Sequence, residues 1–191
     1  ADVRILDKNK IKKEYPIINT DEVIGGILMP GDGAADPSGV THMLAKAAKK
    51  EGAQIFEKSP VEEIITKNGK ISGVKVNGQT INCEYIVLAS GMWSRQIGEK
   101  TGVSIPLYPA EHFYIITEPI DNLSKRLPVI RDFDNRTYIK EDAGKILVGI
   151  FEGNSIPAWN KTNKVPEDFS FGEFQENFEH FEPYLASAIK R

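Results

Sequence analysis

The sequence predicts a mixed α/β (α+β) fold in two parts, with a change of character near residue 104. Before that point, short apolar runs alternate with helix signals and two Asn-Gly turns. Beyond it, successive strands are separated by polar turns, which is the order of an antiparallel sheet. A third observation is the branched apolar run Ile86–Leu88, which is typical of a strand buried on both faces.

The first part begins with polar residues up to 21 and a strand-like segment, Val23–Met29. A helix is then predicted to begin with Asp36 as its N-cap and Pro37 at its first position. It runs to about residue 51, and Gly52 provides a left-handed cap. The face that we expect this helix to bury consists of Val40, Leu44, Ala47 and Ala48.

A small antiparallel meander follows, because Asn68-Gly69 and Asn77-Gly78 are strong signals for two-residue hairpin turns. The β-rich segments of this region are Gln54–Phe56, Val61–Thr66, Lys70–Val76 and Thr80–Asn82. The chain then returns to a sheet at Tyr85–Ala89 and continues into a short helix, Ser94–Lys100, that ends at Gly102.

The second part is predicted to be an antiparallel sheet followed by a terminal helix. Its strands are Ile105–Leu107, Glu111–Thr117, Pro128–Arg131, Thr137–Lys140 and Lys145–Phe151. The terminal helix is expected to pack through phenylalanines at helical spacing, with His180 on its solvated side. These phenylalanines are Phe171, Phe174, Phe178 and Phe181.

Composition excludes several classes of function. The net charge is −3 and the isoelectric point is near 5.7, whereas nucleic acids and anionic membranes require a basic surface. The single cysteine, Cys83, excludes an internal disulfide, and no set of residues has the spacing of metal ligands. With no secretory pattern or membrane-spanning run, we expect a cytoplasmic protein, or one from the mitochondrial matrix.

The end of the predicted Tyr85–Ala89 strand is a candidate nucleotide site. Ala89, Ser90 and Gly91 are small enough for a ligand to lie against the backbone, and Trp93 offers a flat apolar wall. Open α/β sheets bind nucleotides at the carboxyl ends of their strands. No GxGxxG follows any strand, however, so a pyrophosphate-binding loop is missing.

Five segments together resemble the dimethylglycine and sarcosine dehydrogenases, which are D-amino-acid-oxidase-like flavoproteins. They occur in the same order and at similar spacing from about Ile24 to the end of the chain. The segments are Gly25–Gly39, Ala89–Arg95, Pro109–Glu118, Leu127–Asp132 and Val148–Glu152. The resemblance covers only the middle of such a protein, so we expect a fragment of a longer parent.

The resemblance implies that residues 1–104 are a partial FAD-binding, Rossmann-like domain with a β-meander. Residues 105–191 would be a partial substrate-binding domain, and strand 24–29 would join its sheet. The parent would oxidise an N-methyl amine by hydride transfer to FAD, since no side chain accepts a hydride. Its partners would be a small N-methyl amino acid, an electron acceptor and, in some members, tetrahydrofolate. The isolated chain is expected to hold FAD weakly or not at all.

The resemblance also implies roles for particular residues. Val61 would meet the adenine through its main chain, and the Ala89–Gly91 segment and Trp93 would contact the flavin nucleotide. His112 and Tyr138 would be catalytic. Strand alternation puts His112 on the same face as Tyr114, and a neutral imidazole can accept the proton of a substrate ammonium group.

Other interpretations stay open at this point. Arg131 and Arg136 have the geometry to hold a carboxylate, but we expect them to pair at the surface with Asp132, Asp134 or Glu141. Trp159 can close a pocket or anchor a loop. The substrate can be glycine, proline or another small amino acid, and the chain can be catalytically inert and bind a partner.

Overall fold

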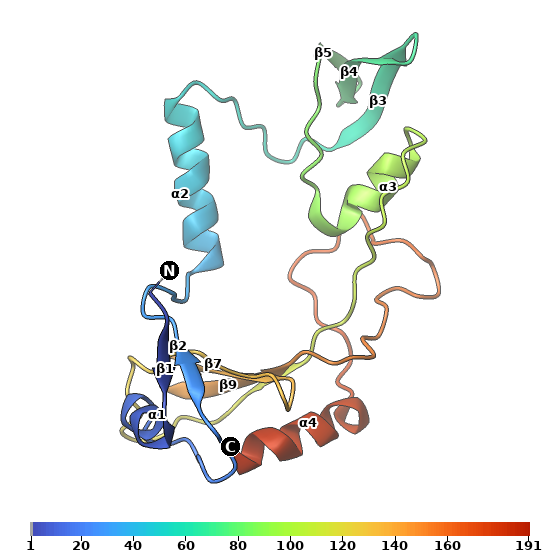
Figure 1. The fold of residues 1–191 in the computed structure, drawn as a ribbon. Coiled ribbons are helices and arrows are strands. Elements are labelled where there is room, and N and C mark those ends of the chain that lie inside the picture. The colour runs from blue at the N-terminus through green and yellow to red at the C-terminus, as the bar shows by residue number, and fades with distance from the viewer. Residues whose placement is uncertain (1) are drawn as a thin grey trace. The chain divides into compact units, whose positions relative to one another are not determined.

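The computed structural model describes residues 2–191 and divides them into two compact units (Figure 1). The first unit contains the residues up to 36 together with residues 111–156 and 173–191. The second contains residues 37–110 and 157–172. Each unit is therefore assembled from segments that are distant in the sequence.

The first unit holds two antiparallel sheets. Strands β1 (Arg4–Leu6) and β2 (Gly26–Leu28) pair with each other, and helix α1 (Lys8–Glu14) lies between them in sequence. A four-stranded sheet has the order β6-β9-β8-β7. Its strands are β6 (Tyr114–Ile116), β7 (Ile130–Asp132), β8 (Thr137–Asp142) and β9 (Lys145–Ile150). This sheet confirms the antiparallel order predicted for the second half of the chain.

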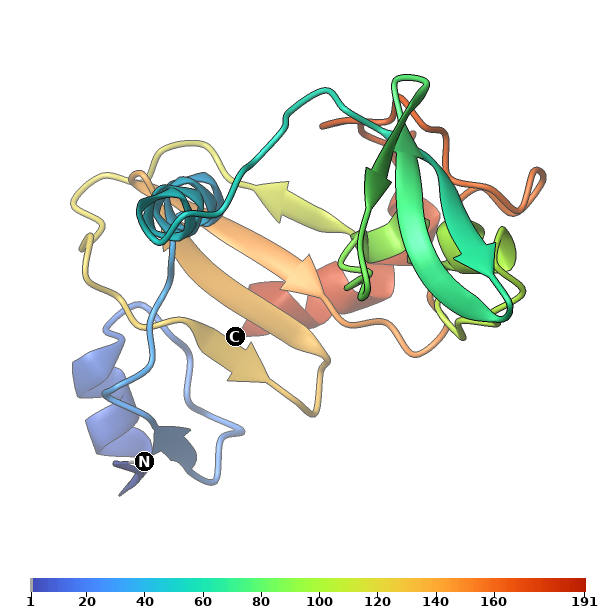
Figure 2. The same ribbon diagram turned by 90° about the horizontal axis from the view of Figure 1, so that it is seen from above.

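One face of the four-stranded sheet forms the core of the first unit. Alternate residues of β8 and β9 point to this face, and helix α4 (Phe178–Lys190) contacts both strands (Figure 2). The buried cluster consists of Tyr15, Ile18, Ile139, Ile146, Val148 and Ala188. Residues from the first twenty positions and from the last helix thus share one apolar core.

The end of α4 is also tied to the sheet by polar contacts. Arg191 Nε donates to Asp132 Oδ2 at 2.9 Å, and Asn135 donates to the same carboxylate. Burial raises the pKa of Asp132, but the hydrogen bonds from Asn135 and Arg191 outweigh it and leave the pKa below its ordinary value. Asn19 Nδ2 donates to the Lys190 carbonyl at 3.0 Å.

The second unit contains the meander that the two Asn-Gly turns predict. Its strands are β3 (Val61–Lys67), β4 (Lys70–Val76) and β5 (Gln79–Asn82), in the order β3-β4-β5. Both residues of each turn have positive φ, between 49° and 74°, as a type I′ hairpin requires. The helices of this unit are α2 (Pro37–Lys50), the 3₁₀ turn η1 (Gly91–Trp93) and α3 (Ser94–Glu99).

Glycine ends both α2 and α3, as predicted. Gly52 and Gly102 have φ of 93° and 74°. After each helix, the glycine N–H donates to the carbonyl three residues back and the next N–H to the carbonyl five residues back. These two bonds define a Schellman motif, which satisfies the last carbonyl groups of a helix.

The predicted strand at Tyr85–Ala89 is wrong. Residues 85–90 have no regular secondary structure, and the side chains of Tyr85 and Val87 are 86% and 89% exposed. A strand buried on both faces needs neighbours that accept its hydrogen bonds. None of the three sheets among residues 2–191 includes this segment.

Other predicted elements also differ. Segments Gln54–Phe56 and Ile105–Leu107 are not strands, and the residues before position 21 form β1 and α1. On α2, Val40, Leu44 and Ala47 are exposed, whereas Ala48 is half-buried. The apolar pattern predicted the helix correctly and its burial wrongly.

The terminal helix is shorter than its phenylalanines predict. Its N-cap is Asn177, whose side chain accepts the His180 N–H, so Phe171 and Phe174 precede it. Phe181 is buried, but Phe178 is exposed. His180 is not solvated, because its ring packs against that of Phe113 with the two ring centroids 5.1 Å apart. None of the helices among residues 2–191 is long and apolar enough to span a bilayer.

Tyr15 generates a prediction about stability. Its side chain is 3% exposed, and its buried hydroxyl has no hydrogen-bond partner among the described residues. Burial, followed by the charge of Glu141, raises its pKa to about 12. A tyrosine in the unfolded chain titrates near 10, so stability is complete below about pH 10 and is lost as the pH rises toward about 12.

We therefore expect Tyr15→Phe to leave the free energy of unfolding at pH 7 unchanged or slightly higher, since an unpaired hydroxyl leaves the core. The variant should also lose less stability than the wild type between about pH 10 and 12. Urea unfolding at pH 7 and across the range from about pH 10 to 12 measures both effects. Tyr85→Phe, at an exposed tyrosine, is the control. A loss of more than about 1 kcal/mol at pH 7 would contradict the prediction.

Candidate functional site

A row of residues in register crosses the four-stranded sheet. Tyr114 on β6 pairs with Gly149 on β9, Gly149 with Tyr138 on β8, and Tyr138 with Arg131 on β7. Directly opposed residues of an antiparallel sheet point to the same face. This face is the one turned away from the buried cluster, because Ile139 and Val148 alternate with Tyr138 and Gly149.

The structure brings the two predicted catalytic side chains together on this face. His112 Nε2 lies 3.1 Å from Tyr138 Oη, and the two rings are parallel within 1° at a centroid distance of 5.9 Å. His112 is exposed, whereas Tyr138 is half-buried. The imidazole is therefore accessible to a small molecule, and the phenol holds it from the side.

Phe151 joins this pair and was not singled out from the sequence. Its ring centroid lies 5.7 Å from that of His112 and 5.3 Å from that of Tyr138. The Arg131 guanidinium lies over the same ring, 5.2 Å from its centroid. The alternation of residues after Gly149 is the sequence signal that places Phe151 on this face.

Gly149 makes the approach of Tyr138 possible. A Cβ at position 149 would overlap the Tyr138 ring. The phenol therefore lies across β9 only because that strand has no side chain there.

Burial, followed by the neighbouring Tyr114, raises the pKa of Tyr138, and the positive charge of Arg131 opposes this. The hydroxyl therefore stays protonated at neutral pH. A protonated hydroxyl both donates and accepts hydrogen bonds. It donates to Nε2 of His112 when the ring proton is on Nδ1, and it accepts from Nε2 when Nε2 carries a proton, in the other neutral tautomer or in the protonated ring. Tyr138 thus stabilises the imidazole in both states.

The residues predicted to contact the nucleotide lie in the second unit. Val61 begins β3 opposite Val76 and is partly exposed. Ala89 is exposed, Ser90 half-buried, and Gly91 begins η1 with a φ of 51°. No protein atom lies within 4 Å of the position that a Cβ on Gly91 would take. The backbone here is open to close approach, as the predicted contact with a nucleotide requires.

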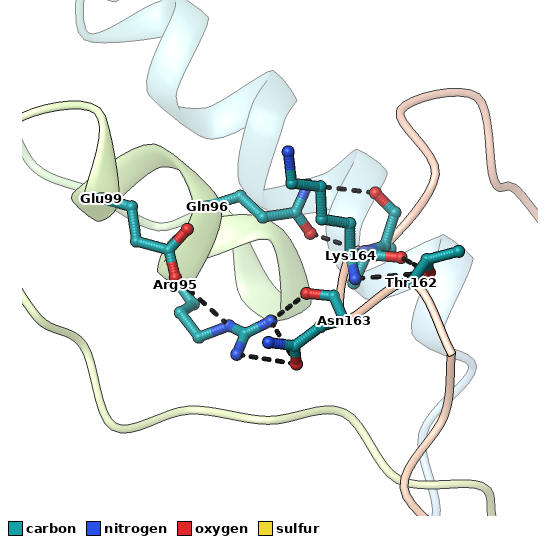
Figure 3. A network of polar contacts seen from close by, with 7 residues as sticks. Arg95, Gln96, Glu99, Thr162, Asn163 and Lys164 are labelled. Atoms are coloured by element: carbon teal, nitrogen blue, oxygen red, sulfur yellow. Dashed lines mark hydrogen bonds and ion pairs between the residues drawn. The ribbon is translucent and has the colours of Figure 1, made fainter. Parts of the chain in front are cut away.

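Trp93 is fixed by a loop from the end of the second unit. Its Nε1 donates to the Pro166 carbonyl at 2.9 Å. Gln96 forms two hydrogen bonds with the backbone of Val165, at 2.6 and 3.1 Å, and Arg95 donates to Asn163 (Figure 3). The ring of Trp159 packs edge-on to Phe169 at 4.8 Å, which favours its role as a loop anchor.

The predicted site residues therefore form two sets. His112 and Tyr138 belong to the first unit, and Val61, Trp93 and the Ala89–Gly91 segment belong to the second. Their roles stay predictions. Among residues 2–191, no group of three His, Cys, Asp or Glu side chains is arranged to hold a metal ion.

Comparison with known proteins identifies the family. A family model described as FAD dependent oxidoreductase (DAO) matches residues 1–191, so the chain belongs to the D-amino-acid-oxidase family of FAD-dependent oxidoreductases. The predicted resemblance to sarcosine dehydrogenase is confirmed, since the human mitochondrial enzyme is 32% identical over 98% of this chain and 20% of its own length.

Two further curated proteins are similar to this chain. The 4-methylaminobutanoate oxidase (formaldehyde-forming) of Paenarthrobacter nicotinovorans is 36% identical over 96% of this chain and 22% of its own length. The mitochondrial pyruvate dehydrogenase phosphatase regulatory subunit of Mus musculus is 33% identical over 98% of this chain and 21% of its own length. The chain thus spans about a fifth of the length of these relatives.

A solved structure confirms the predicted fold class. L-proline dehydrogenase from P. horikoshii matches with a TM-score of 0.79 and 27% identity, covering 98% of this chain and 47% of that one. The mixed helix and antiparallel-sheet architecture is therefore that of a D-amino-acid-oxidase-type flavoprotein.

Gly149 provides a test of the geometry on the open face. We expect Gly149→Ala to displace the Tyr138 ring, break the hydrogen bond with His112 and cost about 1–3 kcal/mol of stability, as overpacking does. Urea unfolding measures the cost, and a crystal structure or NMR shows the ring. The control is Gly31→Ala, where no atom lies within 4 Å of the added Cβ. Equal stability of both variants would show that Tyr138 does not lie across β9.

Proposed function

We propose that this chain is part of an FAD-dependent oxidoreductase that oxidises a small N-methyl amine or amino acid of the sarcosine or dimethylglycine type. The observation that carries the proposal is the 3.1 Å contact between His112 and Tyr138 on an open sheet face, in a chain of this family. The similarity to a sarcosine dehydrogenase and to a 4-methylaminobutanoate oxidase supports the substrate class.

We assign the cofactor contacts to the second unit. The main chain of Val61 would meet the adenine, the open backbone of Ala89–Gly91 would allow close approach, and Trp93 would form a wall. When bound, FAD supplies the hydride acceptor that side chains lack. The division into an FAD portion, residues 1–104, and a substrate portion, residues 105–191, stays part of this proposal, although the residues up to 36 belong to the first unit. Strand β2 also pairs with β1 and not with the four-stranded sheet.

His112 is assigned the proton transfer. An N-methyl amine is protonated near neutral pH, and its nitrogen lone pair must be free before the N-methyl carbon loses a hydride. In the tautomer with its proton on Nε2, a neutral His112 donates to Tyr138 Oη and accepts the substrate proton at Nδ1. Imidazole can accept a proton near neutral pH, whereas the phenol stays protonated and contributes a hydrogen bond.

The proposal predicts the effect of removing the imidazole. In the FAD-loaded protein that contains this chain, His112→Ala should slow flavin reduction by sarcosine or dimethylglycine by about 10²- to 10⁴-fold, the usual contribution of a general base. Anaerobic stopped-flow absorbance measures the rate. His42→Ala, an exposed histidine on α2, is the matched control and should be unaffected.

Two results would count against this assignment. An unchanged rate in His112→Ala would remove the residue from the mechanism. If L-proline or glycine reduces the flavin faster than N-methyl substrates do, the amino-acid oxidase alternative is correct. The fold similarity to L-proline dehydrogenase supports that alternative.

A second candidate function is a catalytically inert chain that binds a partner. The 33% identity to a protein whose name describes a regulatory subunit favours it. Under this alternative, neither N-methyl substrates nor amino acids would change the flavin absorption of the loaded protein. Substrate-dependent bleaching of the flavin in the absence of oxygen would contradict it.

FAD binding by this chain alone is expected to be weak, because no GxGxxG segment is present to hold the pyrophosphate. Titrating FAD into residues 1–191 and recording the flavin absorption and fluorescence measures this. Tight binding with a perturbed spectrum would show that Val61, Trp93 and the Ala89–Gly91 segment suffice for the cofactor.

A further inference from the structure

A buried carboxylate and a histidine lie between β9 and α4, and the proposed mechanism uses neither of them. Glu152 comes two residues after the end of β9, and its side chain is only 3% exposed. Its Oε1 lies 3.9 Å from Nε2 of His180, in the first turn of α4. Both atoms are buried, and neither has a hydrogen-bond partner among residues 2–191. Each group therefore depends on the other for its polar contact.

This pair lies behind the open-face site, because the chain sends neighbouring side chains to opposite faces. Phe113 follows His112 in sequence and packs against the His180 ring, with the centroids 5.1 Å apart. Glu152 follows Phe151, whose ring contacts His112 on the open face. Consecutive residues of an extended chain alternate in this way. His180 thus contacts both of the segments that carry the open-face rings.

Backbone hydrogen bonds fix the parts that surround the pair. The Ile150 N–H donates to the Phe113 carbonyl at 3.2 Å, so the two segments are neighbours. The His180 N–H donates to the Asn177 side chain at 3.0 Å, which caps α4. A change at the His180 ring or at its acidic partner therefore acts on both segments at once.

The energetics show what such a pair can contribute. A carboxylate loses its hydration on burial, and a protonated imidazole compensates for this loss only when the two groups are held close together. Apolar side chains of similar volume would fill the same space at lower cost. Removing one partner leaves the other buried without compensation. The pair therefore fixes a geometry between the end of β9 and α4 rather than adding much stability.

We propose that Glu152 and His180 form a positioning pair that holds His112 and Phe151 in place for proton transfer from the substrate. This inference rests on the proposed function and adds two residues to it. Both act through His112 from the buried side of the sheet. Because proton transfer to a general base depends on close placement of the groups, loosening the pair should slow the reaction more than it weakens substrate binding.

The first test separates rate from binding in the FAD-loaded protein that contains this chain. Glu152→Gln keeps the shape of the side chain and removes its charge. It should lower the limiting rate of flavin reduction by sarcosine about tenfold to a hundredfold and change the half-saturating concentration by less than about twofold. His180→Gln should have the same effect, and it carries the test if Glu152→Gln does not fold.

Ile146→Val is the matched control, because it removes one methyl group from the same apolar core. It should lower the stability of the protein and leave the limiting rate unchanged. An equal loss of rate in this variant would show that any weakening of the core has the same effect. That result would overturn the inference, as would an unchanged limiting rate in Glu152→Gln and His180→Gln.

A second test asks whether the pair acts through His112. Two changes that remove the same contribution are not additive. In the His112→Ala background, Glu152→Gln should therefore cause no further loss of rate. A further loss as large as that in the wild-type background would contradict the inference.

The failure of this inference and that of the proposed function are distinguishable. If the wild type oxidises sarcosine and both pair variants match it, only the role of the pair is wrong. If the wild type oxidises no N-methyl amine, the proposed function is wrong. The NMR signals of isotope-labelled histidine rings then still test the pair. A His112 signal that shifts in Glu152→Gln but not in Ile146→Val supports it, and a His112 signal unchanged in Glu152→Gln contradicts it.

Discussion

The missing side chain at Gly149 is the constraint on which the open face of the sheet depends. Because β9 presents only backbone at this position, the Tyr138 ring can cross the strand and lie half-buried. The hydrogen bond to His112, the contacts with Phe151 and the raised pKa of Tyr138 all follow from that placement. One glycine in the middle of a sheet thus organises several aromatic groups and one cation.

The two faces of the four-stranded sheet differ because successive side chains of a strand point to opposite faces. Ile139, Ile146 and Val148 point into a core shared with Tyr15 and α4. Their neighbours in sequence point to the other face, where Tyr138 is half-buried and His112 is exposed. The buried face supplies the rigidity that the proposed catalytic geometry requires. On the open face, the exposed imidazole of His112 can meet a ligand.

Local sequence signals predict the structure well where the backbone hydrogen bonds form between residues close in sequence, as in hairpin turns and helix caps. The Asn-Gly turns fixed the meander, Gly52 and Gly102 fixed two helix ends, and the strands near His112 and Tyr138 were recognised. Tyr85–Ala89 was predicted wrongly because its apolar composition depends on neighbouring strands, which the described sheets do not provide. Phe151 and the engagement of Asp132 by Arg191 could not be predicted, since both depend on register between strands and on contacts between distant segments.

The assembly of the first unit from three segments has a consequence for its biosynthesis. Tyr15 and Ile18 share a core with Ala188, and Asn19 bonds to the backbone of Lys190. During translation, α1 therefore has no apolar partner from α4 until residue 188 has left the ribosome. Such non-local contacts slow folding and prolong the exposure of apolar surface to chaperones and to aggregation. The last turn of α4 acts as the closing step of this unit.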